Sequence, residues 1–292
     1  MNKLHALISL FDDPNEDIFS AVEAELLKQN VDVVPELEKA WETTDDLNLQ
    51  RRLEDLIHNI QIKDIKERFR AWLDSPDDDL LYGAFLVSKY QYPELKYEEI
   101  SEIIERIRKE VWLEINNNMT ALEKVKIINH ILFDMNGFTR NNSNFMSPQN
   151  SYLRDVFDTR KGNPVSLSII YSVIAQNLGL PIYGVNLPKN FILAYIDDSE
   201  GLPTSELDID VSILFYINPI NRGAVLSRKE IEFFIRQQKL EPRFSYFLPC
   251  TNHDIILRML NNLLYSYESV DNKPKAAEIR EIMKLFPGIP AF

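Results

Sequence analysis

One apolar helix, followed directly by strand-like runs, constrains the fold of this 292-residue chain most strongly. Residues Val165–Leu178 are mainly apolar, and Gly179 stands where a glycine commonly ends a helix. Beyond Pro181 the chain is rich in Tyr, Val, Ile and Phe, which favours strands. We expect those strands at residues 182–187, 191–196 and 213–217. Helices that precede a block of strands predict an α+β fold rather than alternating strands and helices.

The rest of the chain is predicted to be mostly helical. In residues 15–29 the apolar side chains recur at helical spacing, and Pro14 marks the start because proline is favoured in a first helical turn. Similar patterns predict helices that begin at Val34 and Ser227 and that span residues 47–61, 65–73, 80–90, 97–116, 120–135, 254–268 and 275–285. The acidic residues 197–210 are expected to form a hairpin excursion between the last two strands.

The flanking helices suggest three domains. The opening run LISLFDDPNEDIFSAVEAEL resembles HEAT-type repeats, and the last helix pair resembles a tetratricopeptide-type hairpin. An irregular helical bundle and a plain docking hairpin are the alternatives. We predict a helical N-terminal domain at residues 1–95, an α+β core at 96–230 and a helical C-terminal region at 231–292.

Charge and composition argue against several classes of function. The formal net charge is −13, which disfavours binding to nucleic-acid backbones or to anionic lipid. No run of about 18 apolar residues is present, so we predict no membrane span. The apolar stretch Leu4–Phe11 is followed at once by acids and lacks a small-residue cleavage site, so we expect no secretory signal and a cytoplasmic location.

Cysteine and histidine usage gives no sign of a metal or a cofactor. Cys250 is the only cysteine, so neither an intramolecular disulfide nor a cysteine-rich zinc site is possible. The four histidines, at positions 5, 58, 130 and 253, never stand three or four residues apart. We therefore predict no metal site and no cofactor.

Residues 150–197 carry a series of short motifs that resemble the transglutaminase-like superfamily, in particular its bacterial SirB-type branch. The motifs are Asn150-Ser151-Tyr152-Leu153, Arg160-Lys161-Gly162-Asn163-Pro164, Gly179-Leu180-Pro181, Tyr183-Gly184-Val185 and Leu187-Pro188 with Phe191, followed by Ile217-Asn218-Pro219. The resemblance extends over residues 80–235. It implies a papain- or transglutaminase-like core, in which a helix packs on a small antiparallel sheet.

The resemblance also implies where catalytic groups would lie. The superfamily's enzymes place a cysteine at the start of a buried helix, a histidine on the next strand and an aspartate on the strand after it, for thiol attack on an amide carbonyl. Those positions correspond here to Pro164, Asn190 and Asn218. Proline has no nucleophile, and an amide neither transfers protons near neutral pH nor balances an imidazolium charge. The two asparagines can instead hydrogen-bond each other.

Pro164 and its neighbour still suit a helix start, since proline is tolerated in a first turn and Asn163 can serve as the N-cap. The SirB-type branch as a whole resembles this chain in reading Gly-x-Pro where the catalytic enzymes read Gly-x-Cys. It normally reads Pro-Gly-His-Phe where this chain reads Pro188-Lys189-Asn190-Phe191.

Other residues have a functional and a structural interpretation. Asn150, Tyr152, Asn163 and Ser166 are candidate lining residues of the cleft, with capping and packing as the alternative. Arg160 could bind an anion, or form an ion pair with Asp155, Asp158 or an upstream glutamate. Ser166 or Ser168 with His130, and Cys250 with His253, are candidate nucleophile–base pairs, although helix-interior serines usually bond their own backbone.

We predict a non-catalytic transglutaminase-like protein that serves as a protein- or peptide-binding or scaffold module. The alternative is a divergent hydrolase or acyltransferase that uses another nucleophile in the same cleft. A structural protein without a ligand is a third possibility. The expected partner is a peptide or a protein, with no nucleic acid and no membrane. The sequence indicates no oligomeric state.

Overall fold

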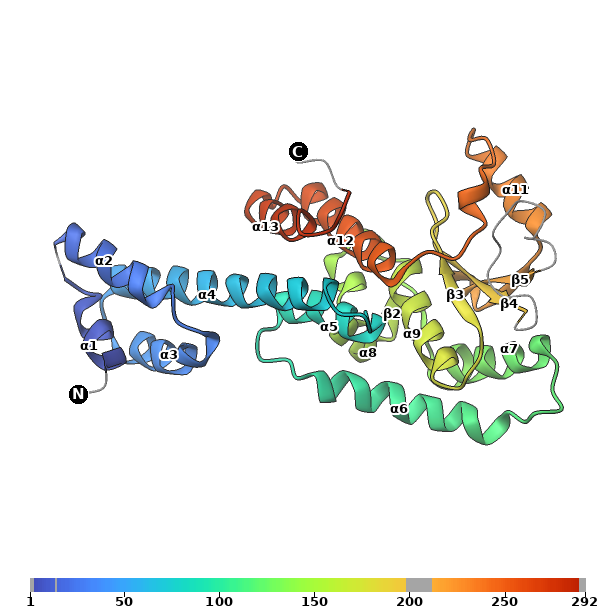
Figure 1. The fold of residues 1–292 in the computed structure, drawn as a ribbon, viewed down its shortest axis with the longest axis horizontal. Coiled ribbons are helices and arrows are strands. Elements are labelled where there is room, and N and C mark those ends of the chain that lie inside the picture. The colour runs from blue at the N-terminus through green and yellow to red at the C-terminus, as the bar shows by residue number, and fades with distance from the viewer. Residues whose placement is uncertain (1–2, 14, 198–211, 289–292) are drawn as a thin grey trace. The chain divides into compact units, whose positions relative to one another are not determined.

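The computed structural model describes residues 3–13, 15–197 and 212–288 (Figure 1). The chain divides into two compact units, Met1–Ala71 and Trp72–Phe292. The three domains predicted from the sequence stay a prediction, and the two compact units are described in turn.

The first unit is built from helices. They are α1 (Lys3–Leu10), α2 (Glu16–Leu26), η1 (Val31–Val33), α3 (Val34–Thr43) and most of α4 (Leu47–Leu73). Phe11, Leu26 and Leu37 are fully buried among them. The sequence predicted two helices where the structure has the single helix α4. That prediction was wrong because residues 61–65 contain neither glycine nor proline, so nothing ends the helix there.

The second unit holds the remaining helices. They are α5 (Leu80–Gln91), α6 (Tyr97–Glu114), α7 (Ala121–Asn129), η2 (His130–Met135), η3 (Pro148–Ser151), α8 (Leu153–Thr159), α9 (Pro164–Gln176), η4 (Pro219–Asn221), α11 (Arg228–Gln237), η5 (Phe244–Tyr246), α12 (Asn252–Ser269) and α13 (Lys273–Met283). The helix start predicted at Ser227 is confirmed, because its hydroxyl accepts a hydrogen bond from the Glu230 N–H.

Four antiparallel strands form the main sheet. They are β3 (Ile182–Val185), β4 (Ile192–Ile196), β5 (Ile213–Asn218) and β6 (Ala224–Leu226), in that spatial order. The first three match the predicted strands, whereas β6 was not predicted. The short parallel pair of β1 (Thr139–Arg140) and β2 (Lys161–Gly162) was not predicted either. The excursion expected at 197–210 lies, beyond Asp197, outside the described residues. The combination of many helices with a small antiparallel sheet confirms the predicted α+β fold class.

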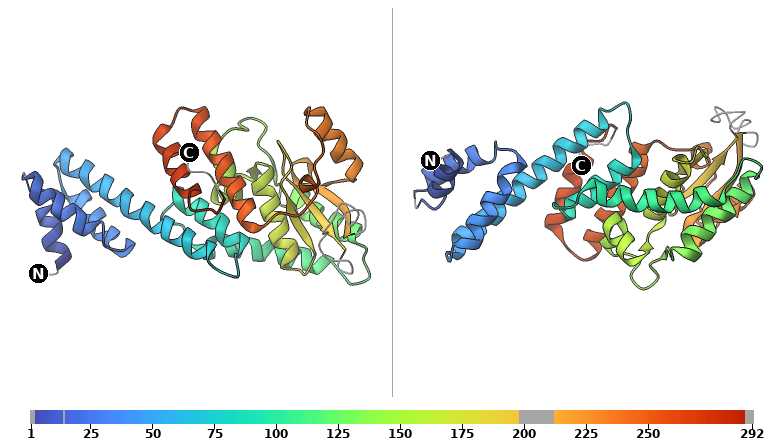
Figure 2. Two further views of the ribbon diagram at one scale, coloured as in Figure 1. Left: turned by 45° about the horizontal axis from the view of Figure 1, so that its top comes forward. Right: turned by 90° about the horizontal axis from the view of Figure 1, so that it is seen from below.

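Helix α9 is the centre of the second unit. Every residue from Val165 to Ala175 is buried. The helix contacts α5 and α6, strands β3 and β4, and α12, as Figure 1 and Figure 2 show. A helix that is apolar on all sides is stable in water only when other elements cover it completely. The apolar run that opened the sequence therefore forms the core of this unit.

The sheet is covered on both faces. Ile192, Ala194 and Ile196 of β4 pack in one cluster with Ile231 and Ile235 of α11. Side chains alternate between the faces of a strand, so Leu193 and Tyr195 point to the other face, where α9 lies. Burial on both faces explains why β4 reads as an uninterrupted apolar run.

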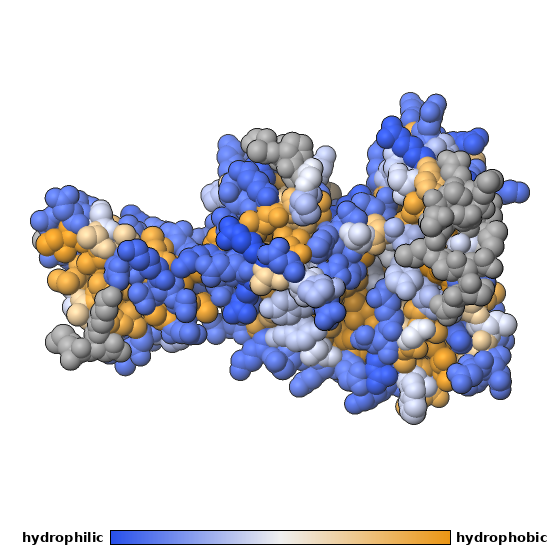
Figure 3. All heavy atoms as spheres, viewed as in Figure 1, coloured by the Kyte–Doolittle hydropathy of each residue, from blue (hydrophilic) through white to orange (hydrophobic). Residues whose placement is uncertain are grey.

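Helix α12 joins the C-terminal helices to the core. It packs on α5, α9 and α13. The Tyr267 hydroxyl shares a hydrogen bond with that of the fully buried Tyr152. In Figure 3, hydrophilic and hydrophobic side chains are interspersed over the visible face of the second unit. None of the described helices has the length and apolarity that crossing a membrane requires.

Gly184 of strand β3 lies close to Ile255 of α12 and to the Phe191 ring. A Cβ atom at this position would lie 2.8 Å from Ile255 Cδ1 and 2.8 Å from Phe191 Cζ. Distances this short mean that a larger residue fits here only if these neighbours move.

We expect Gly184→Ala to lower the free energy of unfolding by about 1–3 kcal/mol, as overpacking does. Replacing glycine by alanine in an unobstructed strand would instead tend to stabilise it. Urea denaturation measures the change. In the variant Ile255→Val the obstructing methyl group is gone, so Gly184→Ala should cost at least about 0.5 kcal/mol less there. Equal costs in both backgrounds would contradict the proposed contact.

Candidate functional site

The start of helix α9 is held by a side-chain cap. The Asn163 Oδ1 accepts hydrogen bonds from the N–H groups of Val165 (2.9 Å) and Ser166 (3.0 Å). The Ser166 Oγ in turn accepts one from the Asn163 N–H at 3.0 Å. Pro164 is the first residue of the helix. The predicted roles of Asn163 as N-cap and of Pro164 in the first turn are therefore confirmed.

This cap changes what the helix start can do chemically. Acyl transfer needs a nucleophile and N–H donors aimed at the developing oxyanion. Pro164 supplies neither a thiol nor an N–H group, because its nitrogen belongs to the ring. The next two N–H groups already bond the Asn163 side chain.

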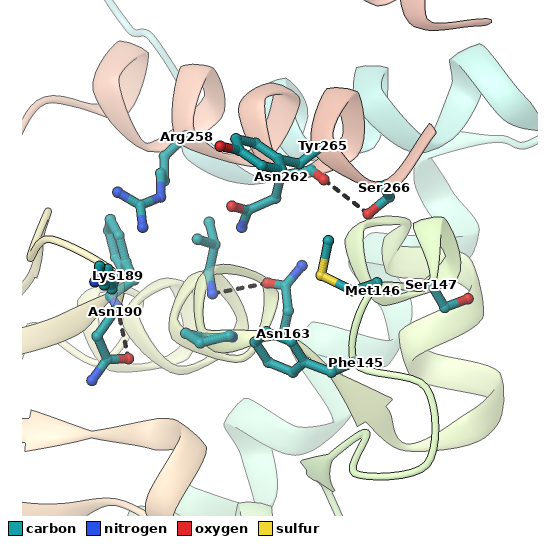
Figure 4. A pocket seen from close by; sticks show the side chains of 13 residues that line it. Phe145, Met146, Ser147, Asn163, Lys189, Asn190, Arg258, Asn262, Tyr265 and Ser266 are labelled. Atoms are coloured by element: carbon teal, nitrogen blue, oxygen red, sulfur yellow. Dashed lines mark hydrogen bonds between the residues drawn. The ribbon is translucent and has the colours of Figure 1, made fainter. Parts of the chain in front are cut away.

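Asn190 lies in the turn between β3 and β4. Its Oδ1 accepts a hydrogen bond from the N–H of Phe191 at 2.9 Å, and its own N–H donates to the carbonyl oxygen of Leu187 at 3.1 Å. In Figure 4 the Asn190 amide points away from Arg258. The residue thus stabilises its own turn.

Asn218 ends strand β5, which pairs with β4 so that Ile217 stands opposite Leu193. The carbonyl oxygen of Asn218 accepts the N–H of Gly223 at 3.0 Å. Its Oδ1 is buried and has no hydrogen-bond partner among the described residues. Within the described part of the chain, Asn190 and Asn218 form no hydrogen bond with each other, although the two amides are chemically able to do so.

A cavity of about 250 Å³ opens beside the start of α9 (Figure 4). We call it the α9 cavity. Four segments line it: the 145–147 loop, the first residues of α9 with their cap, the β3–β4 turn, and one face of α12. Its lining residues are Phe145, Met146, Ser147, Asn163, Pro164, Val165, Lys189, Asn190, Phe191, Arg258, Asn262, Tyr265 and Ser266. The cavity brings together Pro164, Asn190 and Asn163 of the predicted site, but not Asn218.

Asn150, Tyr152 and Ser166 were also predicted to line the cleft, but none of them lines the cavity. Asn150 is buried, and its amide nitrogen donates to the carbonyl oxygens of Asn144 (2.8 Å) and Phe145 (3.0 Å). It therefore holds the loop that presents Phe145 to the cavity. Tyr152 is buried against α12, and Ser166 bonds the cap. These three residues make the contacts expected of capping and packing.

Arg160 forms no ion pair in the described part of the chain, although the charges of Asp158 and of the upstream Glu110 favour its charged form. Its guanidinium carbon lies 5.0 Å from the centre of the Phe138 ring, and its buried Nη1 has no hydrogen-bond partner among the described residues. Burial lowers the pKa of Arg160, with a further contribution from Arg106. Asp155 instead accepts hydrogen bonds from the hydroxyl group of Tyr92.

Among the described residues, no candidate nucleophile forms a hydrogen bond with its candidate base. His130 is exposed, and its Nδ1 lies 3.0 Å from a carboxylate oxygen of Asp134. The Ser168 hydroxyl is buried without a hydrogen-bond partner in the described part of the chain.

Cys250 and His253 likewise serve other contacts. The Cys250 thiol donates to the carbonyl oxygen of Gly184 at 3.3 Å, and burial raises its pKa to about 12. His253 packs edge-on against Trp72, with ring centres 4.9 Å apart. Within residues 3–13, 15–197 and 212–288, no group of three His, Cys, Asp or Glu residues could hold a metal ion.

The α12 wall of the cavity was not predicted from the sequence. Arg258, Asn262 and Tyr265 are spaced by four and three residues, so they share one helix face. Polar side chains in that register on one face of an amphipathic helix are a detectable signal. The predicted boundary at residue 230 assigned them to a separate region.

The backbone conformation of Lys189 was not predicted from the sequence either. It lines the cavity with φ of +60°, a left-handed conformation. This conformation costs a residue with a Cβ atom roughly 1–2 kcal/mol. Such strain often occurs at functional sites, where the side chain is needed at that place.

Comparison with known proteins identifies relatives in several bacteria and in mammals. A UPF0162 protein of Xylella fastidiosa is 28% identical over 227 residues, which are 75% of this chain and 76% of that protein. A UPF0162 protein of Vibrio cholerae is 24% identical over 157 residues, 54% of this chain and 53% of that protein. F-box only protein 21 of Mus musculus is 25% identical over 234 residues, which are 72% of this chain but only 36% of that protein. No solved structure matches the chain.

A family model described as the transglutaminase-like superfamily matches residues 98–261, more than half of the chain. The matched range contains α9, the four strands of the main sheet and ten of the thirteen residues that line the α9 cavity. The chain therefore belongs to the transglutaminase-like superfamily.

Proposed function

We propose that this chain is a non-catalytic member of the superfamily that binds a peptide, or a segment of a partner protein, in the α9 cavity. The start of α9 carries the proposal. Pro164 stands where the resemblance places the thiol, and it removes both the nucleophile and the local N–H donor. A site without these two groups lacks the means for the first chemical step of the family's enzymes.

The remaining catalytic positions support the same proposal. Asn190 and Asn218 are neutral amides, and each is an unsuitable general base at neutral pH. They make separate contacts, Asn190 within its own turn and Asn218 at the end of β5. The motifs also resemble the SirB-type branch, and we extend the assignment to that branch as part of this proposal.

The cavity has the features of a binding site. It is concave, and its wall combines apolar side chains from Phe145, Met146 and Tyr265 with polar and charged ones. Ligand sites in proteins commonly combine these features. The match to F-box only protein 21 covers 36% of that protein, so the shared arrangement occurs there as one part of a longer chain. This supports a module that works together with other segments, and we propose the flanking helices as further interaction surfaces.

A thiol restored at residue 164 should be activated by its position. In Pro164→Cys, made in a Cys250→Ser background, the helix N-terminus should lower the thiol pKa below the value of about 8.5 for a free cysteine. Cys250 of the unaltered chain should stay protonated and unreactive across neutral pH, because burial raises its pKa to about 12. Iodoacetamide labelling as a function of pH, followed by mass spectrometry, compares the two thiols. If the thiol at 164 reacts no faster than Cys250, residue 164 does not occupy the proposed place.

Filling the cavity should abolish partner binding. Asn262→Trp places an indole ring into the cavity from α12, whereas Asn261→Trp alters the preceding residue of the same helix, which does not line it. Crosslinked complexes are captured from cells and quantified by mass spectrometry, and the crosslinked residues are mapped. We expect Asn262→Trp to lose, by about tenfold or more, the partners that crosslink at the cavity, and Asn261→Trp to keep them.

The two tryptophan variants are compared at equal folded concentration, checked by thermal denaturation. Identical partner lists for both variants and the unaltered chain would contradict a role centred on the cavity. Loss of partners in both variants would show that binding depends on α12 as a whole instead.

A further inference from the structure

Two cations gather at one end of the α9 cavity. Arg258 projects from α12 toward the β3–β4 turn, where Lys189 stands (Figure 4). The two side chains come from segments about 70 residues apart and converge only through the fold. In a chain with a formal net charge of −13, this end of the cavity is locally positive. Electrostatic complementarity favours an anionic group there.

Arg258 lacks a charged partner in the described part of the chain. One of its guanidinium nitrogens donates to the Asn186 Oδ1 at 2.9 Å, and this acceptor is neutral. No carboxylate of the described residues forms an ion pair with it. Burial lowers the pKa of Arg258 because no strong opposite charge compensates for the lost hydration. A guanidinium has five N–H donors in a planar fork that matches a carboxylate, so most of its donor capacity is left for a ligand.

Lys189 lines the same end of the cavity and has an unfavourable backbone conformation. Its φ of +60° would suit glycine, which is the residue at this place in the SirB-type motif Pro-Gly-His-Phe. The lysine therefore adds strain together with its charge. Asn190, the next residue, turns its amide away from Arg258, so this neutral group does not occupy the space between the two cations.

At the other end of the cavity, apolar side chains lie among polar ones such as Asn163 and Ser266. Phe145 and Met146 lie across the cavity from Lys189, and Tyr265 lies above them on α12 (Figure 4). The volume of about 250 Å³ is small for a ligand pocket, and it suits a short segment rather than a folded surface.

We propose that the α9 cavity recognises a carboxylate adjacent to an apolar side chain, with Arg258 and Lys189 binding the carboxylate and Phe145, Met146 and Tyr265 packing against the apolar group. The inference rests on the proposed binding function and names its ligand class. A peptide's C-terminal carboxylate and an aspartate side chain have the same chemistry, and the experiment separates the two sources.

Three small probes test the inference on the full chain. They are N-acetyl-alanyl-phenylalanine with a free carboxylate, the same dipeptide as its C-terminal amide, and N-acetyl-phenylalanyl-aspartate α-amide with only the side-chain carboxylate. Binding is followed by two-dimensional NMR of the ¹⁵N-labelled chain. We expect at least one carboxylate probe to bind about tenfold or more tightly than the amide, and its affinity to fall as salt is added.

Two pairs of variants test whether Arg258 and Lys189 bind the carboxylate of the probe. Arg258→Gln should weaken the preferred probe by roughly 30-fold or more, with Arg258→Lys in between because it keeps the charge but loses the fork. Lys189→Gly should weaken it by about fivefold. Lys239→Gly is the matched control, since Lys239 is also a lysine with positive φ (58°) but does not line the cavity. Both glycine variants should fold at least as stably as the unaltered chain.

The outcomes distinguish this inference from the proposed function. Preference for the free dipeptide acid identifies a terminal carboxylate, and preference for the aspartate probe identifies a side chain; either supports the inference. Equal binding of acid and amide, lost in Asn262→Trp, would overturn the inference and leave the binding function standing. Equal effects of Lys189→Gly and Lys239→Gly, or no binding of any probe, would overturn it as well. The crosslinking experiment then decides the proposed function independently.

Discussion

Complete burial of helix α9 is the constraint on which the rest of the second unit depends. A helix without a solvent-facing side must satisfy the polar groups at both its ends from within the protein. At the start, the Asn163 side chain accepts two N–H groups and Pro164 removes a third. At the end, Gly179 takes φ of +71°, and the N–H of Leu180 returns to the carbonyl oxygen of Ala175 at 2.9 Å. Each end thereby directs the chain, one toward the cavity and the other into strand β3.

At the end of α9 where the resemblance places the catalytic cysteine, the nearest N–H donors are occupied by local hydrogen bonds. A reactive helix start presents free donors and a nucleophile to the substrate. This one presents a proline ring, and its nearest donors already bond an amide side chain. The charge lies instead on α12 and the β3–β4 turn, at Arg258 and Lys189. This arrangement supports the proposed function, in which the two cations hold a ligand.

The features that the sequence predicted correctly depend on neighbouring residues. The apolar helix, its end at Gly179, its cap at Asn163 and the first three strands each follow from short-range signals. The single helix α4 was missed because a change in the apolar pattern was interpreted as a break although no breaking residue is present. The α12 wall, the separation of Asn218 from the cavity and the left-handed Lys189 depend on contacts between distant segments or on backbone geometry. One sequence does not contain that information in local form.

The two sides of helix α12 have different structural roles. Ile255, Met259 and Leu263 are buried in the core, whereas Arg258, Asn262 and Tyr265 face the cavity. The buried side is constrained by close packing, in which even a methylene matters. The cavity side meets open space and tolerates exchange. Ligand preference in relatives could therefore diverge through a few substitutions spaced three and four residues apart, while folding, which depends on the opposite side of the helix, is inherited unchanged.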